Sequence, residues 1–132
     1  MNQKYILDSD ILIYFLKGKR DIIEKVISLP QDELYITIIN YTELLYRIHN
    51  SNKVNQNREK ILPFLDKFKI LQFDKSSSEI FAKLKAKLKK QGNVIADMNL
   101  MIASIAISNK ATLFTNNLKY FKRVEDLEIL KL

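Results

Sequence analysis

The chain lacks cysteine altogether and has a single histidine, His49. Without cysteine there can be no disulfide scaffold, no thiolate-bound zinc or iron–sulfur centre and no thiol nucleophile. One histidine excludes any site that needs two imidazoles, such as a zinc helix with paired histidines. Any metal site in this chain must therefore be built mainly from oxygen donors.

Glycine and proline are also scarce, with two of each among 132 residues. This scarcity argues against disordered linkers and against a glycine-rich phosphate loop. No stretch approaches the roughly 20 apolar residues of a membrane span, and no basic segment followed by an apolar one opens the chain. With 47% hydrophobic and 28% charged residues, the composition is typical of a soluble globular protein, and we expect a cytoplasmic location without membrane attachment.

The charges are unbalanced, because 22 basic residues face 15 acidic ones and leave a net charge of +7. Such a surplus favours polyanionic partners, nucleic acid among them, although it could equally serve solubility alone. The length is that of one domain, and neither a repeat nor a linker divides it. We therefore expect a single domain over residues 1–132.

Short β-favouring runs alternate with longer helical patterns along the chain. Strands are expected at residues 5–7, 34–39, 69–73, 112–115 and 128–132. Helices are expected over 11–27, 40–50, a segment after residue 57, 76–90 and 97–109. This alternation predicts an α/β fold with a mostly parallel central sheet of four to five strands, flanked by helices on both faces.

Polar side chains follow several of the predicted strands or open the helices behind them. They are Asp8, Ser9 and Asp10, then Glu43, Asp97 and Asn99, and finally Thr115, Asn116 and Asn117. Because the carboxyl ends of parallel strands meet at one edge of the sheet, we expect these side chains to converge there.

Each acid also has a purely structural interpretation. Asn40 and Glu43 are spaced as an N-cap and its N3 partner, and Asp97 could cap its own helix. Asp8 is harder to explain this way, since a carboxylate at the end of a buried apolar strand is costly unless it is paired or bound to a metal.

Clustered carboxylates repel one another unless a cation lies among them. Oxygen ligands without His or Cys select Mg²⁺ or Mn²⁺, and such an ion beside a basic protein indicates phosphodiester hydrolysis.

Four segments resemble, in order, the motifs of PIN-domain ribonucleases, and in particular those of the VapC toxins of bacterial VapBC toxin–antitoxin pairs. They are Tyr5–Ile13, Tyr41–Leu45, Ile95–Ala103 and Ala111–Asn117. The resemblance covers nearly the whole chain and implies a single PIN-like domain. It also implies a metal-dependent endoribonuclease toxin that hydrolyses RNA, such as tRNA or rRNA, inhibits translation and is neutralised by a cognate VapB-like antitoxin. Toxins of this kind commonly form homodimers and larger assemblies with the antitoxin.

The resemblance also assigns roles to residues of this chain. Asp8 would be a metal ligand, Glu43 would bind the Mg²⁺ or Mn²⁺ ion or orient the water, and Asp97 would be an accessory acid. Ser9, Asp10, Thr115 and Asn116 would complete the polar site. Asn99 departs from the family, which has a metal-binding Asp at this position, so we expect a weakened or inactive enzyme. Whether Asn99 is natural or was introduced to silence a toxic nuclease stays open.

Two other interpretations compete with a nuclease. One is a catalytically inactive PIN-like module that binds RNA or a protein, which Asn99 favours. The other is a receiver domain, which the spacer in Asp8-Ser9-Asp10 disfavours because a receiver needs two adjacent acids. Lys83, Lys87 and Lys90 share a helix face that could bind RNA or could merely be solvated. The aromatic residues Tyr14, Phe15, Tyr41 and Tyr46 are expected mainly in the core, although some of them could instead line an apolar groove.

Overall fold

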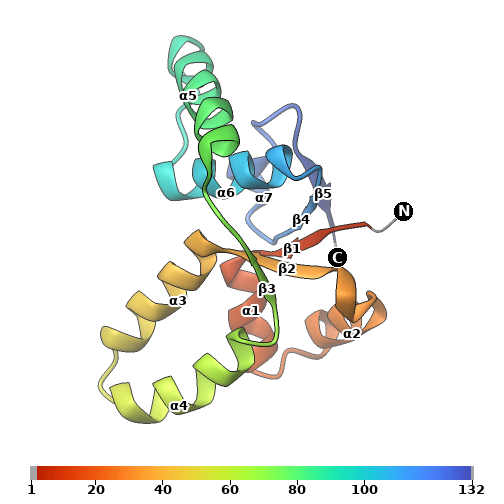
Figure 1. Ribbon diagram of the computed structural model, residues 1–132, viewed down its shortest axis with the longest axis vertical. Coiled ribbons are helices and arrows are strands. Elements are labelled where there is room, and N and C mark those ends of the chain that lie inside the picture. The colour runs from red at the N-terminus through yellow and green to blue at the C-terminus, as the bar shows by residue number, and fades with distance from the viewer. Residues whose placement is uncertain (1–2, 132) are drawn as a thin grey trace.

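The computed structural model describes residues 3–131 as a parallel α/β structure (Figure 1). Within this range five short strands form one sheet in the order β3-β2-β1-β4-β5, and all neighbouring pairs are parallel. The strands are β1 Tyr5–Leu7, β2 Leu34–Thr37, β3 Lys69–Leu71, β4 Thr112–Phe114 and β5 Glu128–Leu130. The predicted fold class is confirmed, and all five strands lie within the segments expected from the sequence.

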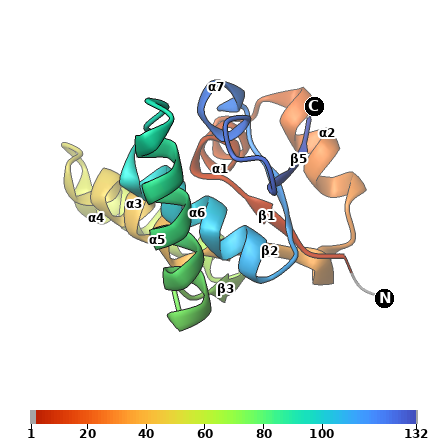
Figure 2. The same ribbon diagram turned by 90° about the horizontal axis from the view of Figure 1, so that it is seen from above.

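Helices cover both faces of this sheet. They are α1 Ser9–Leu16, α2 Arg20–Ser28, α3 Ile38–His49, α4 Val54–Leu65, α5 Lys75–Lys90, α6 Asp97–Ser108 and α7 Leu118–Phe121. Helices α1 to α4 lie on one side of the sheet and α5 to α7 on the other (Figures 1 and 2). None of the helices in residues 3–131 has the length and apolar character that crossing a membrane requires.

The alternation of side chains along the strands divides the core into two layers. Ile6 packs with residues of α5, α6 and α7, whereas its neighbour Leu7 packs with residues of α1, α2, α3 and α4. Leu113 and Phe114 of β4 divide between the layers in the same way. Successive side chains of a strand point to opposite faces, so an uninterrupted apolar run is what a sheet covered on both sides requires.

The first long helix expected from the sequence is in fact two helices. Gly18 adopts a left-handed conformation with φ of 81°. The amides of Gly18 and Lys19 donate to the carbonyls of Phe15 and Tyr14, respectively, which is a Schellman ending. The apolar spacing that suggested continuity spans α1 and α2, because both helices bury one face against the same layer of the core.

Candidate active site at the carboxyl edge of the sheet

A cleft opens where the strand order reverses. The chain proceeds from β1 outward to β2 and β3, and later adds β4 and β5 on the opposite side of β1. Ligand sites in open parallel sheets lie at the carboxyl ends of the strands beside such a reversal. The cleft has a volume of about 390 Å³ and is lined by Asp8, Ser9, Asp10, Tyr14, Glu43, Asn99, Asn116 and Asn117. It is termed the acid cleft below.

Asp8 is the most firmly held of the acids. It follows β1, caps α1 and has only 5% of its surface exposed. Its Oδ1 accepts from the amide of Ser9 at 2.9 Å and from Nδ2 of Asn40 at 3.2 Å, while its Oδ2 accepts from Oγ1 of Thr115 at 2.7 Å. Burial raises the pKa of Asp8 above its ordinary value, although these hydrogen bonds oppose the shift.

Glu43 reaches the same cleft from α3. Its Oε1 accepts from Oγ of Ser9 at 2.7 Å, which joins the second acid to the segment that carries the first. Burial raises the pKa of Glu43, the bond from Ser9 opposes the increase, and the negative charge of Asp8 adds to it. The two acids that the sequence analysis placed together thus share a hydrogen-bonding neighbour.

Asp10 is the third acid of the cleft. Its Oδ1 accepts from the amide of Ile11 at 2.7 Å, and its Oδ2 accepts from the amide of Asn116 at 3.0 Å. Burial, followed by the charge of Asp8, raises the pKa of Asp10 to about 6. This carboxylate therefore ties the segment after β1 to the segment after β4.

Asn40 connects these groups, and the sequence analysis assigned it a different role. It is fully buried, and its Oδ1 accepts from the amide and the hydroxyl of Thr37 at 3.0 and 2.7 Å. Its Nδ2 donates to Asp8 and to Oγ of Ser9. The capping box of α3 is Thr37–Asn40, not the expected Asn40–Glu43 pair, because β2 ends at Thr37. Glu43 consequently has no part in this capping box. The feature of the sequence that could have predicted the box is the T-x-x-N spacing of Thr37 and Asn40.

Replacing Asn40 by alanine should destabilise the protein by roughly 1–3 kcal/mol, because it leaves a buried carboxylate and a helix-capping amide with fewer partners. Urea denaturation of Asn40→Ala would measure the loss. Asn55→Ala, at an exposed position of α4, is the matched control and should change stability by less than about 0.5 kcal/mol. Equal stability of the two variants would contradict a structural role for the Asn40 network.

The remaining predicted residues divide between the cleft and the surface. Thr115 is buried against Asp8, and Asn99 and Asn116 line the cleft. Asp97 does not line it: its carboxylate is exposed and lies 3.0 Å from Nζ of Lys85. Residues two apart on a helix occupy different faces, so Asp97 and Asn99 diverge.

The basic face of α5 is likewise outside the cleft. Lys83, Lys87 and Lys90 do not line the acid cleft, and Nζ of Lys87 lies 3.5 Å from the carboxylate of Glu125. An RNA-binding role for these three residues stays a prediction.

The donor set of the cleft suits a hard divalent cation. Among the residues that line it, the strong ligands are the carboxylates of Asp8, Asp10 and Glu43 and the amide of Asn99, and no lysine or arginine is present to neutralise them. Within residues 3–131 no three acid or imidazole side chains stand together as a complete ligand group. Mg²⁺ needs only one or two carboxylates, with waters and substrate oxygens filling its octahedron. The raised pKa values of all three acids reflect an electrostatic cost that a cation would offset.

An apolar groove adjoins the acid cleft and shares Ser9 and Glu43 with it. The groove has a volume of about 660 Å³, and its other lining residues are Ile13, Thr42, Leu44, Tyr46, Arg47, Asn50 and Met98. Tyr46 and Met98 are 68% and 41% exposed. Tyr46 is therefore not part of the core and takes the alternative place expected for some of these aromatic residues, in an apolar groove. Tyr14, also expected in the core, is half-buried and lines the acid cleft.

Comparison with known proteins supplies the family. A profile of the PIN domain family matches residues 5–127. Ribonuclease VapC2 of Rickettsia felis is 34% identical over 125 residues, which cover 93% of each chain. The tRNA(fMet)-specific endonuclease VapC of Shigella flexneri is 28% identical over 94% of each chain.

Solved structures agree with the sequence comparison. In the crystal structure of VapBC2 from Rickettsia felis bound to a DNA fragment from its promoter, one chain superposes on this one with a TM-score of 0.91 and 31% identity. The match covers 98% of this chain and 99% of that chain. This chain therefore belongs to the PIN domain family and, within it, to the VapC ribonucleases.

Proposed function

We propose that this protein is a metal-dependent endoribonuclease toxin that hydrolyses phosphodiester bonds of RNA and thereby inhibits translation. The observation that carries the proposal is the convergence of Asp8 and Asp10, at the start of α1, with Glu43 of α3 on one cleft without a lining lysine or arginine. The acids of such a cleft repel one another unless a cation lies among them. A divalent ion supplies that positive charge and can also bind a phosphate oxygen, so the cleft suits an ion with a phosphate better than an uncharged ligand.

In the proposed mechanism Asp8, Glu43 and Asn99 would hold a Mg²⁺ or Mn²⁺ ion. Such an ion lowers the pKa of a water molecule and offsets charge on a phosphate. Asp8 is kept in position by Ser9, Asn40 and Thr115. Glu43 is only partly buried and keeps Oε2 free of hydrogen bonds from residues 3–131. This free oxygen would be available to bind the ion or to orient the attacking water.

Position 99 sets the level of activity in this proposal. An amide oxygen can contact a divalent ion but brings no negative charge to it, so Asn99 should bind the ion more weakly than the Asp that the family pattern has there. A slow enzyme is the expected consequence. The second candidate function, a non-catalytic PIN-like module that binds RNA or a protein, is favoured by this same residue.

The proposed substrate is tRNA or rRNA. The Shigella flexneri relative is named for tRNA(fMet), and the net charge of +7 favours any structured RNA.

Incubating the purified protein with total bacterial RNA tests the function directly. With Mg²⁺ or Mn²⁺ we expect slow, site-specific fragments whose ends can be sequenced, and at least about tenfold less cleavage in EDTA. Undiminished cleavage in EDTA would contradict the metal-dependent mechanism.

The proposed regulator is a VapB-like antitoxin, since the Rickettsia felis relative was crystallised as a VapBC2 complex. The apolar groove beside the acid cleft, with Tyr46 and Met98 exposed, is a suitable surface for an apolar peptide segment. We also propose a homodimer, alone and within a larger complex with the antitoxin. Co-expression with the adjacent upstream reading frame, followed by co-purification and measurement of molar mass, would test the partner and the oligomeric state together.

A further inference from the structure

The acid cleft cannot hold an RNA strand by charge attraction from its own walls. Its lining contains three carboxylates and no lysine or arginine, and an RNA strand carries one negative charge at each phosphate. If RNA is the substrate, as the proposed function has it, the basic side chains that help a bound ion to retain the strand must therefore lie outside the cleft.

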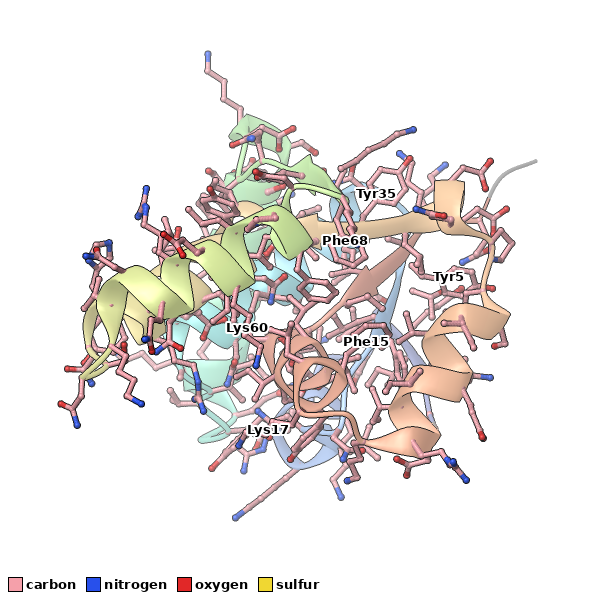
Figure 3. The ribbon with its side chains drawn as sticks, turned by 90° about the horizontal axis from the view of Figure 1, so that it is seen from below. Tyr5, Phe15, Lys17, Tyr35, Lys60 and Phe68 are labelled. Carbon is pink, nitrogen blue, oxygen red and sulfur yellow. The ribbon has the colours of Figure 1, made fainter. Side chains whose placement is uncertain are left out.

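A pocket between α1, α3 and α4 supplies such cations. Lys17, Arg47 and Lys60 line it together, over a floor of Ile13, Leu16, Leu44 and Ile61, with Asn57 at the side. Its volume is about 160 Å³. Figure 3 shows Lys17 by α1 and Lys60 by α4, and both residues line the same pocket. The three cations with their apolar floor are termed the basic pocket.

The cations of the basic pocket form no ion pair with an acid of the described residues. No acid lines the pocket, and the ion pairs found within residues 3–131 are Lys85–Asp97 and Lys87–Glu125, both elsewhere. Lys17, Arg47 and Lys60 are all exposed, so their side chains can reach a ligand without rearrangement of the core. Three such cations in a concave site favour a polyanion over a neutral ligand.

The basic pocket is continuous with the acid cleft through the apolar groove. The groove shares Ser9 and Glu43 with the cleft, and it shares Ile13, Leu44 and Arg47 with the basic pocket. Arg47 lies one turn beyond Glu43 on α3, about 6 Å along the axis, and Lys17 lies about 12 Å beyond Ser9 along α1. These separations suit neighbouring phosphates of one strand that enters the cleft.

We propose that the basic pocket is a subsite for the RNA backbone, where Lys17, Arg47 and Lys60 bind phosphates next to the one that is cut. The apolar floor of Ile13, Leu16, Leu44 and Ile61 would accommodate a ribose or a base edge between them. The subsite rests on the proposed function for its ligand, but its test does not depend on cleavage. An acidic protein segment is the competing occupant.

The test measures binding of a short fluorescent 2′-O-methyl RNA, which resists hydrolysis, by anisotropy in EDTA at several salt concentrations. Lys17→Gln, Arg47→Gln and Lys60→Gln combined should weaken binding by at least about tenfold and should lower the slope of log K against log salt by about two. The matched control combines Lys75→Gln, Lys122→Gln and Lys131→Gln, three exposed lysines outside the acid cleft, the apolar groove and the basic pocket. It removes the same charge elsewhere and should affect both quantities much less. Circular dichroism would verify that both triple variants are folded.

Other outcomes have distinct meanings. Equal losses in the two triple variants would overturn the subsite in favour of a diffuse charge effect. Unchanged RNA binding together with weaker binding of an acidic peptide would assign the pocket to a protein. If the pocket variant binds RNA weakly while no variant of position 99 cleaves any RNA, the subsite stands and the proposed nuclease activity fails.

Discussion

Replacing Asn99 by aspartate should raise metal-dependent RNA cleavage by about 100-fold or more. Asn99 lines the acid cleft with Asp8, Asp10 and Glu43, so the substitution adds a fourth carboxylate of nearly the same shape where the amide now stands. A charged oxygen binds Mg²⁺ far better than a neutral one, and changes at metal ligands or their supports typically alter affinity or activity by about 10–100-fold or more. Initial rates on one RNA substrate at saturating Mg²⁺ would measure the effect.

The control for this gain is Asn55→Asp, which adds the same charge on the exposed surface of α4 and should leave the rate unchanged. Mg²⁺ should also raise the unfolding temperature of Asn99→Asp more than that of the unmodified chain, because binding to the folded state alone stabilises it. Equal cleavage by Asn99→Asp and the unmodified chain would show that position 99 is not a ligand. Absence of cleavage from both, with Mg²⁺ present, would favour the non-catalytic module.

The layered fold could be predicted because its signals are local and repeated. Apolar strands such as Tyr5–Leu7 and Thr112–Phe114 are buried on both sides, and this reads directly as a parallel sheet. The order of the strands could not be predicted in the same way. No local pattern in the sequence predicts that β1 lies between β2 and β4. This order nevertheless places Asp8 at the point where the strand order of the sheet reverses.

The candidate site was predictable in its acids but not in its supports. Asp8 stands out because a charge at the end of an apolar strand needs an explanation, whereas Glu43 could be a helix cap and was assigned to the site by the family resemblance. Asn40 does not stand out, because an amide near a helix start is ordinary, and its bonds to Asp8 and Ser9 span 32 and 31 residues of sequence. Asp97 and Asn99 are two residues apart in sequence, yet only Asn99 faces the cleft, since the rotation of α6 depends on how its apolar residues pack.

Charge patterns were the least specific signals. The lysines of α5 are conspicuous as a run in the sequence, whereas Lys17, Arg47 and Lys60 are scattered along it and only the packing of α1, α3 and α4 brings them to one pocket. A run of lysines on one helix face reflects an exposed surface as readily as a binding site. Convergence of cations from separate elements needs the tertiary structure.

Asp8→Asn should abolish cleavage and, without metal, stabilise the fold. In the Asn99→Asp background we expect a loss of about 1,000-fold or more, because the buried ligand next to β1 loses its charge. The new amide keeps an oxygen for Ser9 and Asn40, and Thr115 can rotate its hydroxyl to accept from the new NH₂ group. The hydrogen bonds around position 8 are therefore largely retained, and loss of activity would not report unfolding.

The stability change follows from the pKa of Asp8, which burial raises above its ordinary value of 3.8. An acid whose pKa is raised by folding contributes stability that is fully present below the ordinary pKa and is lost as the pH rises through the raised one. Asparagine stays neutral, so the two proteins should unfold alike in acid and diverge as the pH increases. In EDTA near neutral pH, we therefore expect the variant to melt at a higher temperature than the unmodified protein. Mg²⁺ should stabilise the unmodified protein more than the variant. Melting curves without the ion therefore measure how much the buried charge destabilises the fold, and curves with the ion measure how much the same charge contributes to metal binding. A variant that melts lower than the unmodified protein in EDTA at every pH would mean that Asp8 is retained for the fold and not for a metal.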